Sequence, residues 1–106
     1  MEIATLNALR KFDDLKMQKV PIFTSDRLYY DLYCLLPGQF QRVHSHTDQD
    51  KIYLVLEGEP TFEIGSEREQ LVEGRAVIAR AGVTHGVRNE TDQRIVLLVT
   101  MAPRPE

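Results

Sequence analysis

The sequence is poor in cysteine and tryptophan: its 106 residues include one cysteine, Cys34, and no tryptophan. A single cysteine cannot form an internal disulfide, so the fold must rest on a hydrophobic core, and nothing points to an oxidising compartment. A domain of this length buries about two-thirds of the surface that its unfolded chain exposes, which suffices for such a core. We therefore expect one domain and, by default, a cytoplasmic protein.

Long apolar runs and basic tracts are also missing. No segment approaches the roughly 20 apolar residues of a membrane-spanning helix, and the first residues, with Asp13 and Asp14, lack the build of a secretion signal. Thirteen basic and sixteen acidic residues give a net charge of −3, without the Lys and Arg clusters that neutralise phosphates. We expect neither a membrane nor a nucleic acid as partner. A metal, a small molecule and a second copy of the chain remain.

The N-terminal stretch differs in pattern from the rest. Ile3, Leu6, Leu9 and Phe12 recur at steps of three, which is typical of a short amphipathic helix, and Pro21 ends the pattern because proline lacks the amide that a helix interior needs. We therefore expect residues 1–22 to form an N-terminal extension, helical in part. Residues 23–106 would form the main domain.

The main domain has the pattern of an all-β fold. Segments rich in β-branched and aromatic residues end at turn signals, such as Pro37-Gly38 and Gly65-Ser66, roughly every eight to twelve residues. The expected strands are 28–36, 40–46, 51–57, 60–64, 70–72, 76–79, 86–88 and 94–101. Many short antiparallel strands favour a closed barrel of the jelly-roll type, since closure removes exposed strand edges.

The chain holds three histidines, and two of them form the tripeptide His44-Ser45-His46. Residues i and i+2 of a strand point to the same face, about 6 to 7 Å apart, so both imidazoles would face the interior. His85 follows a glycine turn between two expected strands, and only tertiary folding can bring it to the pair. We predict that the three imidazoles converge on one metal ion. The alternative is a metal-free pocket in which they bind an anion or respond to pH.

Two stretches around these histidines resemble the motifs of the cupin family. One is similar to G-x5-H-x-H-x(3,4)-E-x6-G and the other to G-x5-P-x-G-x2-H-x3-N. The matching residues are Gly38, His44, His46 and Gly58 in the first motif and Gly74, Gly82, His85 and Asn89 in the second. The resemblance covers about half the chain. It implies the cupin double-stranded β-helix, a jelly-roll barrel, here with a short N-terminal helical segment.

The resemblance also implies that the three histidines and a glutamate ligate a divalent transition metal: Fe, Zn, Ni, Mn or Cu. Two residues depart from the motifs. Arg80 stands at the position of the proline, which removes a rigid turn but no ligand. Lys51 stands at the position of the metal-binding glutamate, six residues before Gly58. The expected ligands are therefore His44, His46 and His85.

Lys51 weakens the expected metal site without abolishing it. An ammonium about 5 Å from a divalent ion is repelled by roughly 7 kcal/mol at an effective dielectric of about 20. Structural zinc sites bind with about 10 to 16 kcal/mol. We expect the ammonium to turn toward the barrel mouth, where Asp48 or Asp50 could pair with it, or toward an anionic ligand. Asp50 could replace the glutamate only through a bulge, since alternation points it away from Lys51.

Other side chains near the expected site are candidates for chemistry. Lys51 and Tyr53 share one face of their strand, and either could serve in acid–base catalysis, so both are candidate catalytic residues. Tyr53 is also the best pocket aromatic. Arg42 has the parity of His44 and would lie at the rim, whereas Cys34 is typical of a small buried hydrophobe.

Two classes of function fit these features. A three-histidine face leaves coordination positions for water, dioxygen or substrate, which predicts a metal-dependent enzyme, an oxidoreductase or isomerase such as a dioxygenase. The alternative is a non-catalytic cupin module that binds or senses a small molecule or anion without turnover. The short chain and Lys51 favour this alternative. A metal-binding cupin with a small-molecule ligand covers both.

The composition of two strands predicts a homodimer. The segments 28–36 and 95–101 are apolar on both faces, so something must cover the face turned away from the core. A second copy of the chain is the expected partner, with the N-terminal segment lying across the same face.

Overall fold

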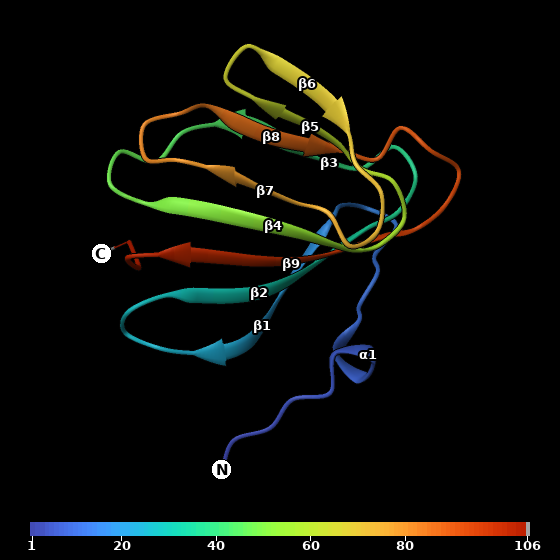
Figure 1. The fold of residues 1–106 in the computed structure, drawn as a ribbon. Helices are drawn as coiled ribbons and strands as arrows, with labels where there is room; N and C mark the ends of the chain where they lie inside the picture. The colour runs from blue at the N-terminus through green and yellow to red at the C-terminus, as the bar shows by residue number, and fades with distance from the viewer. Residues whose placement is uncertain (106) are drawn as a thin grey trace.

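A computed structural model describes residues 1–105, which form two antiparallel sheets with the core between them (Figure 1). The larger sheet has the strand order β1 (Gln18–Thr24), β2 (Tyr29–Leu35), β9 (Ile95–Ala102), β4 (Asp50–Glu57) and β7 (Ala76–Ala79). The smaller has the order β3 (Phe40–His44), β8 (His85–Arg88), β5 (Thr61–Ile64) and β6 (Glu67–Gln70). The single helix of these residues, α1, spans Leu6–Leu9. The predicted all-β class is confirmed.

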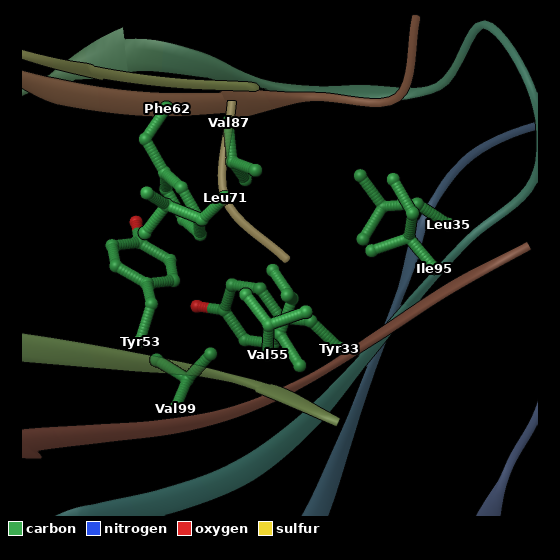
Figure 2. Close-up of a cluster of buried hydrophobic side chains, with 10 residues drawn as sticks. Tyr33, Leu35, Tyr53, Val55, Phe62, Leu71, Val87, Ile95 and Val99 are labelled. Atoms are coloured by element: carbon green, nitrogen blue, oxygen red, sulfur yellow. The ribbon is translucent and has the colours of Figure 1, made fainter. Parts of the chain in front are cut away.

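Strand alternation places the core between the sheets. In β4, every second residue is buried: Lys51, Tyr53 and Val55. Asp50 and Ile52, which alternate with them, are exposed. The inward residues of both sheets form one apolar cluster (Figure 2). Its members are Tyr33, Leu35, Tyr53, Val55, Phe62, Leu71, Val87, Ile95, Leu97 and Val99. The inner face of β4 therefore runs from the core at Val55 to a charged residue, Lys51, at one end of the barrel.

The N-terminal part differs most from expectation. The helix is a single short turn, and residues 18–24 form β1, so the expected boundary between residues 22 and 23 falls inside a strand. Pro21 lies within β1 at the edge of the larger sheet, the place in a sheet where proline is tolerated. The strand expected at 70–72 lies at 67–70 instead.

The N-terminal segment lies across the outer face of the larger sheet, as expected. Leu9 and Phe12 pack against a second buried cluster made of Leu32, Cys34 and Val96. Cys34 is a free, fully buried thiol, which confirms its assignment as a small hydrophobe. In the part of the chain that the structure describes, no helix has the length and apolar character that a membrane crossing requires.

Gly58, directly after β4, is a position where a side chain would collide with the fold. Its φ is +85°, and a Cβ atom there would lie 2.5 Å from the Arg94 carbonyl oxygen and 2.8 Å from Ile95 Cγ1. Gly74 has the same φ of +85°, but a Cβ atom there would have no other atom within 4 Å. Gly58→Ala should therefore destabilise the protein by about 1 to 3 kcal/mol more than Gly74→Ala, because only the first adds a clash to the shared backbone strain. Urea unfolding of both variants measures this difference, and equal losses would contradict the close contact.

Candidate metal centre

The pairing of β3 with β8 brings the first two histidines together. His44 is the last residue of β3 and lies directly opposite His85, the first residue of β8. Their ring centroids are 4.4 Å apart. His46 follows in the loop after β3, with its ring 4.8 Å from that of His44 and 5.4 Å from that of His85. The three imidazoles thus converge as predicted, and one nitrogen of each lies within 4.8 Å of the others.

Backbone carbonyls orient two of the rings. His44 Nδ1 lies 2.7 Å from the Arg42 carbonyl oxygen, and His85 Nδ1 lies 3.0 Å from the Val83 carbonyl oxygen. A carbonyl only accepts, so each Nδ1 carries the proton and each Nε2 keeps its lone pair for a ligand bond. A hydrogen bond from the ring nitrogen that does not bind the metal is the usual way in which a metal-binding histidine is oriented.

Two ring nitrogens that share a hydrogen bond are also spaced to fit a metal ion. His44 Nε2 and His46 Nε2 are 3.1 Å apart, and two nitrogens at about 2.1 Å from one ion, with an angle of about 90 to 110°, are separated by roughly 3.0 to 3.4 Å. His85 Nε2 is buried and has no hydrogen-bond partner among residues 1–105. A buried nitrogen without a partner is costly, and a bound ion would satisfy it.

Burial keeps these imidazoles neutral. It lowers the pKa of His85 to about 4, and it also lowers the pKa values of His44 and His46. The positive charge of Lys51 acts in the same direction on all three. At neutral pH the rings are therefore in the uncharged form, with one nitrogen free of a proton, that metal binding requires.

Lys51 does not turn toward the barrel mouth, and this corrects the expectation from sequence. Its side chain is buried, at 2% exposure, and Nζ donates a hydrogen bond to Gln41 Oε1 at 3.2 Å. Nζ also lies 5.2 and 5.1 Å from the ring centroids of Tyr33 and Tyr53. Alternation along β4 turns the residue inward, and the amide oxygen and two aromatic faces then stabilise the ammonium there.

The two aspartates near Lys51 do not pair with it. Asp50 Oδ1 accepts a hydrogen bond of 2.8 Å from the Ala81 amide, and its side chain lies on the opposite face of β4 from Lys51. Asp50 thus stabilises a turn and does not replace the missing glutamate. Asp48 is exposed in the loop after His46.

Gln41 is a site residue that sequence reasoning missed. Its side chain is buried, and Oε1 accepts hydrogen bonds from Lys51 Nζ and from the Tyr53 hydroxyl, the second at 2.8 Å. The register of β3 against β8 shifts between Gln41 and His44, so both residues face inward although they are three apart. Arg42 is exposed, in agreement with its expected place at the rim. Simple alternation over 40–46 contains no signal for this bulge.

An open cavity of about 440 Å³ lies against His44 and His46, and Tyr53 does not line it. Tyr53 is fully buried, with its ring 6.3 Å from that of His85 and 5.0 Å from that of Phe62. Its side chain points into the apolar cluster, toward Phe62 (Figure 2). The aromatic residues of the cavity wall are Tyr29 and Tyr33. The expectation that Tyr53 would be the pocket aromatic is therefore wrong.

The cavity wall also contains two charged residues that sequence reasoning missed, Lys19 and Asp31. Asp31 is the one charged residue of β2, and it lies on the same face of the strand as Tyr29 and Tyr33. This single charge in an otherwise apolar strand could have indicated a site residue. Burial raises the pKa of Asp31, and Lys19 and Lys51 partly oppose this effect. Lys19 gave no signal, because β1 was not recognised as a strand.

Comparisons with known proteins agree with the fold. A model of the cupin domain matches residues 31–101. The TT1209 protein from Thermus thermophilus superposes with a TM-score of 0.96 at 50% sequence identity, over 99% of this chain and 100% of that chain. No curated protein matches the sequence.

More distant structures share the fold alone. A cupin superfamily protein from Desulfitobacterium hafniense DCB-2 is 19% identical with a TM-score of 0.82, over 93% of this chain and 88% of that chain. A predicted oxalate decarboxylase from Thermotoga maritima is 13% identical with a TM-score of 0.81, over 97% of this chain and 100% of that chain. The predicted double-stranded β-helix is thereby confirmed.

Burial of Lys51 predicts a specific dependence of stability on pH. Burial, and then the charge of Lys19, lowers the pKa of Lys51 from 10.5 to about 7 in the folded protein. Between these values the unfolded chain binds more protons at Lys51 than the folded chain, so the free energy of unfolding rises with pH. From pH 7 to 9 the metal-free wild type should gain about 2 kcal/mol relative to Lys51→Met.

Urea unfolding in the presence of a chelator measures this gain. The exposed Lys16 provides the control, because Lys16→Met should follow the wild-type profile at every pH. Parallel profiles for wild type and Lys51→Met would show that Lys51 titrates normally.

Proposed function

The chain belongs to the cupin domain family, and on that premise we propose that it binds a divalent transition metal through His44, His46 and His85. The observation that carries the proposal is the convergence of three neutral imidazoles on one point, with His85 Nε2 buried and unpaired there. Fe, Zn, Ni, Mn and Cu are the candidate metals. Nitrogen ligands suit these ions better than Mg or Ca.

The ligand of this site would be a small organic molecule in the adjoining cavity. A cavity of about 440 Å³ lies in the size range of small-molecule sites. His44 and His46 form part of its wall, so a molecule there would reach the coordination positions that three ligands leave free. When bound, the metal would supply a Lewis acid at this wall.

An oxidoreductase or isomerase, for example of the dioxygenase type, is the enzymatic form of this proposal. The residues available for proton transfer are Asp31, whose pKa is raised by burial, and Lys51, whose pKa is about 7. Both line the cavity, so both could exchange a proton with a bound molecule. Tyr53 would act indirectly, since its hydroxyl donates to Gln41 and so positions the acceptor of Lys51.

A non-catalytic module is the alternative, and Lys51 is the observation that favours it. In place of the glutamate that the cupin motif has, this chain buries an ammonium beside the histidines. Such a charge weakens metal binding and attracts anions. The chain would then bind or sense a small anion without turnover.

Elemental analysis of purified protein tests the metal site. His44→Ala should bind metal roughly 100-fold more weakly or worse, because it removes a ligand and not merely an outer partner. Lys51→Glu should bind metal more tightly than wild type, since it removes a repelling charge and restores a carboxylate. Asp48→Ala, in the exposed loop beside the site, is the control and should retain the wild-type content.

Incubation with Fe, Mn, Ni and Zn before the analysis separates weak binding from no binding. Wild-type protein that stays empty after all four incubations would overturn the proposed function. A Lys51→Glu variant that binds no better than wild type would contradict the repulsive role of the ammonium.

We further propose that the chain forms a homodimer through the outer face of the larger sheet. The N-terminal segment covers the part of this face around Leu32 and Val96. Farther along, Ile52 is 43% exposed and lies in one row with Tyr30, Ile78 and Thr100. A second copy placed there would cover these apolar side chains, and exposed apolar patches commonly mark such interfaces.

Light scattering at micromolar concentration tests the dimer. Wild type should have twice the mass of one chain, and Ile52→Lys should shift the protein toward the monomer because a charge would be buried at the interface. Val72→Lys is the matched control, since Val72 is 49% exposed and lies in the segment between β6 and β7. A monomeric wild type would contradict the proposal.

A further inference from the structure

Two lysines of the cavity lack an anionic partner. Lys51 Nζ donates to the Gln41 amide oxygen, and Lys19 Nζ lies 5.4 Å from the centroid of the Tyr33 ring. Lys51 Nζ lies 5.2 Å from the same centroid, so both ammonium groups are near one aromatic ring. Among residues 1–105, no carboxylate forms an ion pair with either lysine, and this includes Asp31 in the same cavity wall.

We propose that the cavity binds a small organic monocarboxylate, with the carboxylate group seated at the ammonium groups of Lys51 and Lys19. This inference rests on the proposed function in one point, the position of the metal. The part of the ligand beyond its carboxylate would extend toward His44 and His46 and the metal that they would hold. Lys51 has three N–H donors and gives one to Gln41, so two remain for a carboxylate.

The charges of the wall select a single negative charge. With Lys51 protonated and Asp31 ionised, the two lysines and the aspartate leave one net positive charge in the metal-free cavity. A monoanion neutralises it, whereas a dianion such as phosphate would also face the Asp31 carboxylate. A bound carboxylate would raise the pKa of Lys51, against the lowering that burial and Lys19 cause.

The remaining wall residues favour a ligand with a carbon skeleton. Val99 and Met101 of β9 and the ring of Tyr29 line the same cavity. Met101 is the direct cross-strand neighbour of both Lys51 and Tyr29 in the sheet register. Val99 and Met101 are themselves buried, so the exposed apolar surface of this wall is mainly that of Tyr29. A bare inorganic anion would leave that surface in contact with water, whereas an organic acid would cover it.

Titrations of lactate and of its neutral amide, lactamide, into metal-free protein test the inference without any mutation. The two probes differ in charge and hardly in shape. Lactate should bind at least about 10-fold more tightly than lactamide, because only lactate can form charge-assisted hydrogen bonds. NMR shifts of the backbone amides of Lys19, Asp31 and Lys51 follow the binding and locate it. Phosphate should bind more weakly than lactate.

Substitutions then assign the binding to the lysines. Lys51→Met should weaken lactate binding at least about 10-fold, and Lys19→Met, at an exposed residue, about 3-fold. Asp31→Asn should strengthen it about 3-fold, since it removes the competing carboxylate, and damage to the fold could not imitate that gain. Lys16→Met, outside the cavity, should change nothing.

The outcomes separate this inference from the proposed metal site. Equal binding of lactate and lactamide, or lactate binding that is indifferent to Lys19, Asp31 and Lys51, would overturn the carboxylate site even in a protein that takes up metal. Lactate binding that depends on the lysines, in a protein that takes up no metal, would support the carboxylate site and overturn the proposed function. Metal-loaded wild type should bind lactate more tightly than the metal-free form if both are right.

Discussion

The antiparallel pairing of His44 with His85 is the contact on which the site depends. The two residues are 41 positions apart in the chain, yet they are direct cross-strand neighbours of β3 and β8. Such neighbours have Cβ atoms about 4.5 to 5.5 Å apart, so their rings meet without any strained backbone. The donor set is therefore assembled by the sheet itself, and the loop after β3 only has to return His46 to it. Carbonyls of Arg42 and Val83 then fix which nitrogen of two rings is free.

The bulge in β3 connects this donor set to the floor of the cavity. Because the register shifts before His44, Gln41 also faces the interior. Its amide then joins Lys51, Tyr53 and Tyr33, through bonds of 3.2, 2.8 and 3.4 Å. One glutamine thus satisfies polar groups from two strands of the opposite sheet. Without the bulge these buried groups would lack a partner, which the low polarity of a core makes costly.

Much of the fold and part of the site could be predicted from sequence because their signals are local. Turn residues divided the chain into strands close to β2–β5 and β7–β9, and the histidine spacing, with its motif resemblance, indicated the three imidazoles. The rest depends on tertiary context. β1 contains Pro21 and reads as a break unless its edge position is known. The bulge that turns Gln41 inward cannot be recognised from the alternation of polar and apolar residues. The burial of the Lys51 side chain depends on hydrogen-bond partners that only the folded chain supplies.

In the proposed function, the charge of residue 51 determines which molecule would complete this site. A glutamate at that position would lower the net charge of a metal–histidine cluster, whereas Lys51 raises it. The neutral imidazoles carry no negative charge that could offset this, and Asp31 lies in the cavity wall without an ion pair to either lysine. The excess positive charge is therefore left to the ligand. In a barrel of this design, replacing one acidic side chain by a basic one transfers charge neutralisation from the protein to the bound molecule, and this favours anionic ligands over neutral ones.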